Sequence, residues 1–396
     1  MRILWVCPTF LHPTTRGGQI RTLETLRQLH RWHEIHFVAL DRPDHPEGPR
    51  RAGEYSSFSY PIAHQPPQRG SWGFYQQLIA NLFSPVPLAV SRWSSAAMRR
   101  QIEELQAKLS FDCIVCDFLA AAPNVPRIEQ AVLFQHNIEA TIWDRHADNG
   151  RTALHRLVFR QQARRMWAYE KAICRQSRLV IAVSEPDAER MRHAFELSLV
   201  ADVPTGVDTD YFAPPASTPA AADLVFVGSM DWMPNVDGVT WFRCEILPLI
   251  HARRPDCKVA IVGRMPPPEI QAFAKDPRVI VTGTVPDIRP YFWSSAVSIV
   301  PLRVGGGTRL KIFEAMAAHV PVVSTTIGAE GLPVEDGTHL LIADTPGDFA
   351  ARCLQLLEHA PQRQRMAAVA GQLVKDHFSW EQAARRFERL LTAPAT

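Results

Sequence analysis

The sequence has no excess of one charge and no long apolar run. Its 43 Lys and Arg residues against 40 Asp and Glu residues leave a net charge of +3, which is too balanced for a protein that coats nucleic acid. No run approaches the roughly 18 apolar residues of a membrane span, and the apolar opening stops at Pro8, too early for a signal-peptide core. We therefore expect a cytoplasmic protein that binds no nucleic acid.

The sequence is also poor in cysteine and lacks a dinucleotide fingerprint. Its seven cysteines include one close pair, Cys113 and Cys116, in the apolar stretch FDCIVCDF. Residues three apart on a strand point to opposite faces, so this pair can neither clamp zinc nor close a disulfide. No G-x-G-x-x-G follows the first apolar run, which argues against a dehydrogenase. We expect neither a metal nor an organic cofactor.

Short apolar runs alternate with helical patterns along the chain. They lie at 2–7, 35–40, 113–116, 132–134 and 179–183, and again at 224–227, 259–262, 279–281 and 297–300. This alternation predicts an α/β protein with two mostly parallel sheets covered by helices. Doubly wound domains of this kind bind ligands at the carboxyl ends of their strands, so we expect the ligand in a cleft between the two domains.

A proline-rich segment predicts where the domains meet. The stretch APPASTPAAA at 213–222 is small and uncharged, which is typical of a linker. We therefore predict an N-terminal domain at 1–212 and a C-terminal domain at 223–376. The last segment, 377–396, has the pattern of an amphipathic helix capped by Ser379.

A glycine-rich segment, VGGGTRLKIFEAM, carries the strongest chemical signal. Gly305–Gly307 precede an expected helix start at Thr308, where backbone N–H groups can bind an anion, and Arg309 and Lys311 add two positive charges. Glu314 lies one turn into that helix, where a carboxylate suits paired sugar hydroxyls. The alternative is a plain strand-to-helix turn with a surface pair between Lys311 and Glu314.

Weaker signals lie in the N-terminal half. Gly17 and Gly18, with Arg21, open the first helix and repeat the glycine-and-cation arrangement. His136 directly follows the apolar strand AVLFQ, at the sheet edge where ligands bind. A tight turn and a structural histidine are the alternatives. The D-x-D triplet at 208–210 stands before the linker and away from the main strand ends, which favours a turn over a metal site.

Segment 151–178 is strongly basic, with eight Lys or Arg residues and one acidic residue. Apolar side chains lie among these charges, so peripheral contact with an anionic membrane or a lipid phosphate is one interpretation. The other is a helix whose basic face is solvated and whose apolar side packs on the sheet. The sequence alone favours the second.

Four segments resemble one enzyme family, in the order RGGQIRTLETLRQL, AVSEPDAERM with TGVDTDYF, FVGSMDWMPNVDGVTWF, and VTGTVPDIRPYFWSSAVSIVPLRVGGGTRLKIFEAMAAHVPVVSTTIGAEGL. The resemblance covers nearly the whole chain and is to the retaining glycosyltransferases of family 4, which have the GT-B fold. It implies two Rossmann-like domains facing across a cleft. The C-terminal domain would bind a UDP or GDP sugar and the N-terminal domain the acceptor, with 377–396 crossing back to the N-terminal domain.

Residue by residue, the resemblance is incomplete in the C-terminal domain. Glu314 matches the second glutamate of the family's E-x7-E motif, which holds the nucleotide ribose, but Gly306 stands where the first glutamate belongs. The arginine and lysine that grip the diphosphate after the first strand are also missing, because Gly228 is followed by Ser229 and Asn235 stands nearby. We infer that Arg309 and Lys311 supply these charges.

In the N-terminal domain, His136 aligns with the family's cleft histidine, which is thought to contact donor sugar or acceptor. Gly17 and Gly18 align with the loop that closes on the diphosphate. The triplet at 208–210 belongs to the family's linker turn. The resemblance therefore implies that Gly17, Gly18, Gly228, Ser229 and the 305–308 loop bind the donor without a metal.

The resemblance implies sugar transfer to a hydroxyl of a polysaccharide, a glycolipid or a natural product. One alternative is a sugar-nucleotide epimerase, which needs no acceptor, or a phosphorylase, which would usually need a larger chain and a pyridoxal cofactor. Another is a carbohydrate-binding relative that has lost activity, as the missing glutamate at Gly306 would allow.

Overall fold

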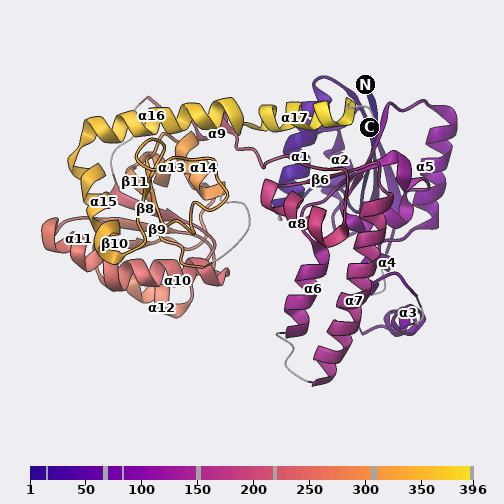
Figure 1. The fold of residues 1–396 in the computed structure, drawn as a ribbon, viewed down its shortest axis with the longest axis horizontal. Coiled ribbons are helices and arrows are strands. Elements are labelled where there is room, and N and C mark those ends of the chain that lie inside the picture. Colours follow the sequence, from indigo (N-terminus) through magenta and orange to yellow (C-terminus); the bar gives the residue numbers. More distant parts are fainter. Residues whose placement is uncertain are drawn as a thin grey trace. The chain divides into compact units, whose positions relative to one another are not determined.

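The computed structural model describes residues 1–14, 17–65, 70–82, 84–148, 153–216, 221–304 and 310–392. The chain folds as two compact units, Met1–Thr205 with Ala383–Thr396, and Gly206–Gln382 (Figure 1). Each unit has one parallel sheet with helices on both faces, as the alternating sequence pattern predicts.

The described part of the first unit has a seven-stranded sheet in the order β3-β2-β1-β4-β5-β6-β7. Its strands are β1 (Arg2–Cys7), β2 (Glu34–Asp41), β3 (Phe58–Ala63), β4 (Cys113–Asp117), β5 (Ala131–Phe134), β6 (Leu179–Ala182) and β7 (Val200–Asp202). Its helices include α1 (Gly17–His30), α2 (Glu47–Arg50), α3 (Trp72–Leu82), α4 (Leu88–Ser91), α5 (Ala96–Lys108), α6 (Glu139–Asp148), α7 (Ala153–Gln176) and α8 (Glu185–Phe195). The strand order reverses between β1 and β4, and folds of this kind bind ligands at the carboxyl ends of the strands beside such a reversal.

The described part of the second unit has a six-stranded sheet in the order β10-β9-β8-β11-β12-β13. Its strands are β8 (Ala222–Val227), β9 (Val259–Val262), β10 (Val279–Val281), β11 (Ser295–Val300), β12 (Val322–Ser324) and β13 (Leu341–Ile342). Its helices include α9 (Thr209–Phe212), α10 (Met233–Trp241), α11 (Leu247–Arg253), α12 (Pro268–Gln271), α13 (Arg289–Trp293), α14 (Leu310–Ala317), α15 (Pro346–Glu358) and α16 (Ala360–His377). Here the strand order reverses between β8 and β11.

The boundary between the units falls before residue 206, earlier than the expected boundary at 212. Residues 206–212 pack within the second unit. The guanidinium of Arg289 lies 3.7 Å from the ring centroid of Tyr211, and the indole Nε1 of Trp293 donates to the carbonyl of Phe212 at 2.8 Å. The second unit therefore begins ahead of the proline-rich segment 213–222.

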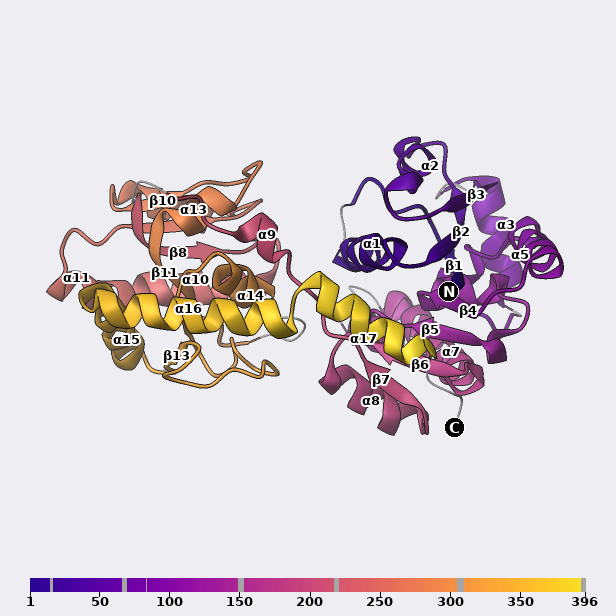
Figure 2. The same ribbon diagram turned by 90° about the horizontal axis from the view of Figure 1, so that it is seen from above.

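The last helix, α17 (Trp380–Thr392), completes the first unit (Figure 2). The Ser379 hydroxyl accepts a hydrogen bond from the Gln382 backbone at its start. Phe387 then packs 5.5 Å from Trp5 and 5.0 Å from Phe134, measured between ring centroids. Across the described residues, no helix is both long and apolar enough to cross a membrane.

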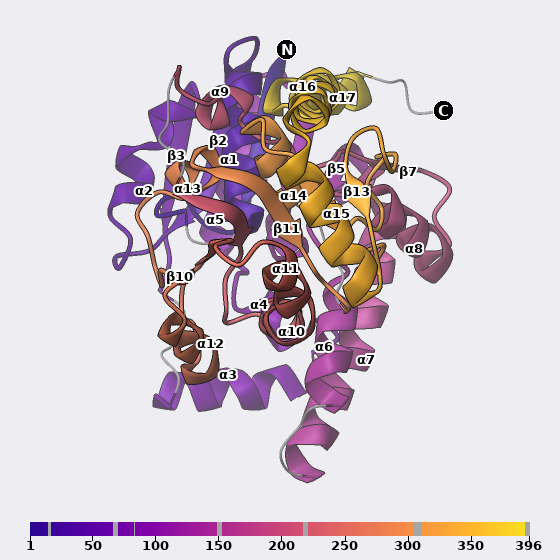
Figure 3. The ribbon, with the colours of Figure 1, turned by 90° about the vertical axis from the view of Figure 1, so that its left-hand side faces the viewer.

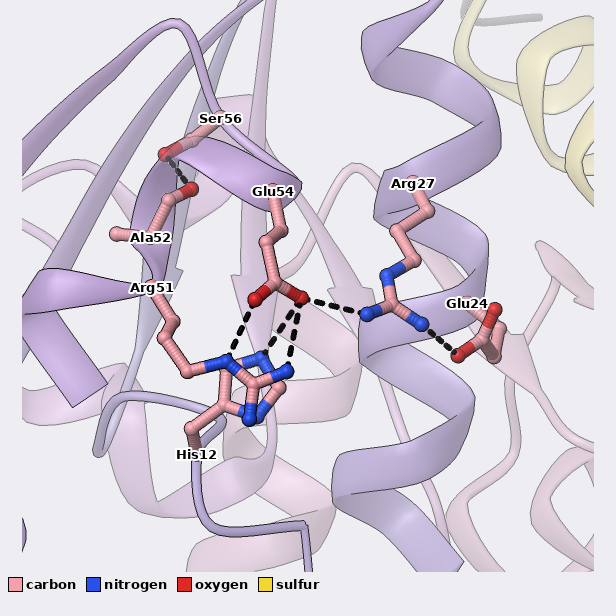
Figure 4. A network of polar contacts seen from close by, with 7 residues as sticks. All are labelled: His12, Glu24, Arg27, Arg51, Ala52, Glu54 and Ser56. Atoms are coloured by element: carbon pink, nitrogen blue, oxygen red, sulfur yellow. Dashed lines mark hydrogen bonds and ion pairs between the residues drawn. The ribbon is translucent and has the colours of Figure 1, made fainter. Parts of the chain in front are cut away.

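A carboxylate network at the surface holds the loop that follows β1 (Figure 4). Glu54 accepts hydrogen bonds from Arg51 and Arg27, both at 2.5 Å, and lies 3.3 Å from the ring of the buried His12. The hydrogen bond from Arg51 is the largest of the effects that lower the pKa of Glu54 to about 2. The ionised carboxylate therefore ties α1 to the segment between α2 and β3.

We expect the stability of Glu54→Gln to fall less at acid pH than the stability of the wild type. The folded chain binds the Glu54 proton with a pKa of about 2, below the ordinary value of a free glutamate, so this group stabilises the fold above about pH 4.3 and loses that effect as pH falls toward 2. Urea denaturation between pH 5 and 2 should show a shallower loss of stability in the variant. Glu47→Gln changes an exposed residue of α2 and should have the same pH dependence of stability as the wild type. A Glu54→Gln variant whose stability depends on pH as the wild type's does would contradict the role of this network.

Candidate functional site

A lysine stands at the crevice of the second sheet. Lys311, in the first turn of α14, donates from Nζ to Asn235 Oδ1 at 2.6 Å, and the Asn235 amide donates to the Ser229 carbonyl at 2.7 Å. The ammonium also lies 4.7 Å from the ring centroid of Phe226 in β8. A positive charge from α14 is thereby placed at the carboxyl end of β8.

Two glycines stand beside this lysine where a side chain would collide with its neighbours. A Cβ at Gly228 would lie 2.8 Å from the Asn235 amide nitrogen and 2.9 Å from Lys311 Nζ. A Cβ at Gly263, after β9, would lie 1.8 Å from the Gly228 carbonyl oxygen. Any larger residue would displace the ammonium or the backbone, so the two glycines keep the end of β8 accessible to Lys311.

Glu314 follows Lys311 by three residues on α14. Its carboxylate is half-buried, and burial raises its pKa to about 7, against the opposing effect of Lys311. It has no hydrogen-bond partner within the part of the chain that the structure describes. A carboxyl group with no partner among the described residues is suited to a hydroxyl donor, and the ribose-binding role expected of Glu314 stays a prediction.

We expect Glu314→Gln to be more stable than the wild type at pH 8 and equally stable near pH 4. The folded chain holds the Glu314 proton up to about pH 7, so between pH 4.5 and 7 it binds more protons than the unfolded chain, and the free energy of unfolding falls as pH rises. Urea denaturation at the two pH values measures this difference. Glu358→Gln, at an exposed ion pair with Arg253, should show no such gain, and a less stable Glu314→Gln at pH 8 would refute the assignment.

The glycine loop itself lies outside the described residues, including Gly305–Gly307, Thr308 and Arg309. Ser229, at the end of β8, accepts a hydrogen bond at 2.8 Å from the Nε of Arg264, which also pairs with Asp231 at 3.0 Å. Sequence reasoning missed Arg264, although it follows directly on the glycine that ends β9. It adds a second cation at the carboxyl edge of this sheet.

A buried polar cluster stands at the crevice of the first sheet. Asp117, the last residue of β4, accepts hydrogen bonds from Trp5 Nε1 at 3.1 Å, Thr22 Oγ1 at 2.8 Å and His136 Nε2 at 2.7 Å. Arg21 in α1 donates to Thr205 Oγ1 at 2.7 Å and approaches His136 Nδ1 at 3.2 Å. Sequence reasoning missed Asp117, whose signal was an acidic residue at the carboxyl end of a buried run.

These contacts determine the protonation of His136. The Asp117 carboxylate can only accept, so His136 carries its proton on Nε2 and offers the Nδ1 lone pair to the Arg21 guanidinium. Burial lowers the pKa of His136, and Arg21 acts in the same direction, while Asp117 opposes both. Burial also lowers the pKa of Arg21, to about 10. At neutral pH the cluster therefore contains a neutral imidazole beside a charged guanidinium.

Gly17 and Gly18 begin α1 beside this cluster. A Cβ at Gly18 would lie 2.9 Å from the Phe118 ring, which stacks on the His136 ring with 4.0 Å between centroids. Phe118 has a φ of 66°, in the left-handed region that disfavours side chains larger than glycine. Gly17 has open space around it. The strained Phe118 and the small Gly18 together hold the imidazole at the end of the sheet.

The remaining candidates have structural roles. The carboxylate of Asp208 accepts from the Tyr211 backbone at 2.8 Å and caps α9, so the triplet at 208–210 forms a helix start. Cys113 and Cys116 are buried free thiols in β4. In the described ranges, no three His, Cys, Asp or Glu side chains are grouped so that they could hold a metal ion.

Two family models match successive parts of the chain. The model for glycosyltransferase family 4 matches residues 15–211, and the model for glycosyl transferases group 1 matches residues 221–359. The first covers the Gly17-to-His136 cluster, and the second covers β8 and α14 with Gly228, Lys311 and Glu314. The matched ranges therefore contain both sheet crevices.

Individual relatives are more distant. The chain is 28% identical over 237 residues to the GDP-mannose-dependent alpha-(1-6)-phosphatidylinositol monomannoside mannosyltransferase of Mycolicibacterium smegmatis, a match that covers 54% of this chain. The curated relatives that it matches are covered over 42% and 62% of their own lengths.

Solved structures agree along the full length of the chain. A glycosyltransferase from Rickettsia africae has a TM-score of 0.63 at 13% identity, with 98% of this chain and 97% of that chain covered. Anabaena Alr3699/HepE in complex with UDP has the same TM-score at 14% identity, with 99% and 100% covered. These likenesses show the fold, and the two family models show the family. The chain belongs to the family 4 glycosyltransferases and has their GT-B fold of two Rossmann-like domains.

Proposed function

We propose that this chain transfers a sugar from a UDP or GDP sugar to a hydroxyl acceptor, with retention of the anomeric configuration. The observation that carries the proposal is the Lys311 ammonium, held by Asn235 at the carboxyl end of β8. A fixed cation at a sheet crevice is suited to the negative charge that develops on a departing diphosphate. The enzyme would work in the cytoplasm without a metal cofactor.

The residues divide into three roles in this proposal. Lys311, Arg309 and the backbone amides of 305–308 stabilise the diphosphate, beside Gly228 and Ser229. Glu314 accepts hydrogen bonds from the ribose hydroxyls. In the first unit, Gly17 and Gly18 approach the diphosphate, and His136 contacts donor sugar or acceptor.

The reaction needs no nucleophile from the chain. The acceptor oxygen forms a bond to the anomeric carbon on the same face from which the diphosphate oxygen departs, and that departing oxygen takes the acceptor's proton. Lys311 and Arg309 stabilise the leaving group throughout. Retention would appear as the same anomeric configuration in donor and product by NMR.

Our expectations for the donor base and the acceptor come from the relatives. The Anabaena neighbour was solved with UDP, and the mycobacterial relative is named for GDP-mannose and for a phosphatidylinositol mannoside acceptor. We therefore propose either base for the donor, and a growing polysaccharide, a glycolipid or a glycosylated natural product for the acceptor.

A thermal-shift panel of UDP, GDP and their sugars, with and without chelator, tests the donor. A ligand at 100 times its Kd should stabilise the fold by about 2.7 kcal/mol. We expect one base to raise the melting temperature, the chelator to have no effect, and Lys311→Met to lose most of the shift. No shift with any nucleotide would contradict the proposal.

A second candidate function follows because a glycine stands where the family's E-x7-E motif has its first glutamate. With Gly306 there, the chain would bind a nucleotide sugar without transferring it. Release of nucleoside diphosphate from the stabilising sugar nucleotide, with an acceptor mixture present, excludes this candidate. Formation of an epimer without acceptor would instead indicate an epimerase.

A further inference from the structure

Helix α3 turns an apolar stripe toward solvent. Trp72, Tyr75 and Ile79 lie at spacings that place them on one helix face, and they are 77%, 50% and 60% exposed. The other end of the helix is anchored, since the buried Asn81 side chain donates to the Val86 carbonyl at 2.9 Å. A helix in a soluble protein ordinarily turns such a stripe toward the core.

The N-terminal half of α7 is also exposed and apolar, and it is basic. Leu157 and Val158 are 67% and 44% exposed. Arg156, Arg160 and Arg164 follow at intervals of four, which places them in one row along the helix. All three are exposed, and none has an ion-pair partner among the residues that the structure describes.

In the C-terminal half of α7 the charged side chains have partners or are buried. Lys171 and Arg175 pair with Glu196 at 2.9 and 3.3 Å. Glu170, the one acidic residue of this helix, is buried and accepts from the backbone of Glu139 and Ala140 at 2.9 and 2.8 Å. Within the described ranges, Arg156, Arg160 and Arg164 therefore have no ion-pair partner, whereas Lys171 and Arg175 are paired.

The two exposed surfaces belong to one end of the first unit. Arg165 of α7 donates to the Asn81 carbonyl of α3 at 2.7 Å, and Gln162 accepts from the Leu88 backbone at 3.1 Å. Figures 1 and 3 both show α3 beside α7, with the start of α7 extending beyond it. We call this end the α3–α7 tip and define it by Trp72, Tyr75, Ile79, Arg156, Leu157, Val158, Arg160 and Arg164.

We propose that the α3–α7 tip docks on an anionic lipid bilayer. Trp and Tyr side chains prefer the boundary between headgroups and acyl chains, and Leu and Ile gain from entering the apolar layer. Arginine reaches lipid phosphates while its stem stays against the apolar region. The combination of exposed apolar side chains with exposed arginines that have no ion-pair partner in the described part of the chain matches such a surface in both hydrophobicity and charge. The inference is independent of the sugar-transfer proposal.

The structure also shows which part of the basic segment 151–178 belongs to the proposed docking surface. Segment 151–178 was expected to have mainly a solvated, structural face. The paired residues Lys171 and Arg175 fit that expectation, but Arg156, Leu157 and Arg160 do not. The docking surface is limited to the first turns of α7 and gains α3, which sequence reasoning did not include.

Co-sedimentation of the full chain with vesicles tests the proposal. We expect binding to phosphatidylcholine vesicles that contain phosphatidylglycerol, weak binding to phosphatidylcholine alone, and weaker binding at high salt. Changing Arg156, Arg160 and Arg164 to Gln should lower the affinity about 100-fold, from the attraction of about 1 kcal/mol per arginine. Ile79→Asp with Leu157→Asp should abolish binding.

Matched controls separate docking from a general loss of solubility or folding. Leu249→Asp with Ile280→Asp changes two exposed apolar residues of the second unit and should leave vesicle binding as in the wild type. All variants should retain the wild-type melting temperature. Equal binding to both vesicle types, or undiminished binding by Ile79→Asp with Leu157→Asp, would overturn the proposal. So would a wild-type dimer in light scattering that Ile79→Asp dissociates, because a second copy would then cover the tip.

Discussion

Replacing Lys311 with methionine is expected to lower kcat for sugar transfer by about 10²- to 10³-fold, the usual effect of losing one preorganised charge at a developing anion. Methionine nearly matches the length of lysine but carries no charge. The hydrogen bond to Asn235 and the position over the Phe226 ring leave the ammonium little freedom, so its stabilising effect needs little reorganisation during the reaction. Steady-state kinetics with the donor identified by thermal shift measures the change.

Two further variants make this result specific. Lys311→Arg keeps the charge and should recover part of the lost rate, although the planar guanidinium will not fit the space above Gly228 equally well. Lys275→Met removes an exposed lysine elsewhere in the second unit and should have no effect. Transfer by Lys311→Met at the wild-type rate would refute the assignment of this lysine to the diphosphate.

Asp117→Asn is expected to destabilise the fold by about 3 kcal/mol, the scale of an unsatisfied group in a buried charged network. The carboxylate accepts from Trp5, Thr22 and His136 without exposure to water. An amide offers one oxygen for these three donors, and its own N–H groups would face a donor. To accept from the amide, His136 would have to move its proton to Nδ1, where it would meet the Arg21 guanidinium.

Urea denaturation followed by far-UV circular dichroism measures the loss. Asp44→Asn provides the matched control, because Asp44 is exposed and, among the residues that the structure describes, pairs with its neighbours Arg42 and His45 alone; such surface pairs contribute about 0–1 kcal/mol. We also expect Asp117→Asn to lower turnover, since the imidazole loses its fixed orientation. A variant as stable as Asp44→Asn would show that the Asp117 cluster tolerates an amide.

The central strands could be predicted because they are buried on both faces. In β1, β4 and β5 nearly every residue is apolar, so the sequence shows a continuous run that no solvent-facing residue interrupts. The edge strand β3 could not be predicted, because its side chains are mostly exposed or half-buried and Pro61 lies within it. Strand β13 has two residues, too few for any pattern.

Sequence alone could point to candidate site residues only where the signal is a local pattern. Lys311 and Glu314 stand beside a glycine loop, and Gly228 ends an apolar run, so each has a signal within a few residues. Asp117 depends on three partners that are far away in sequence, and only the fold brings them together. Local composition likewise does not reveal that Arg289 and Trp293 hold Tyr211 and Phe212 within the second unit.

The order in which the chain is synthesised differs from the order in which its units can be completed. The second unit is one uninterrupted stretch, whereas the first unit needs α17, which is made after the whole second unit. Until Phe387 leaves the ribosome, Trp5 and Phe134 lack the ring that covers them, and a nascent chain presents that aromatic surface to chaperones and to other chains. The unit that is made first is therefore the one that matures last.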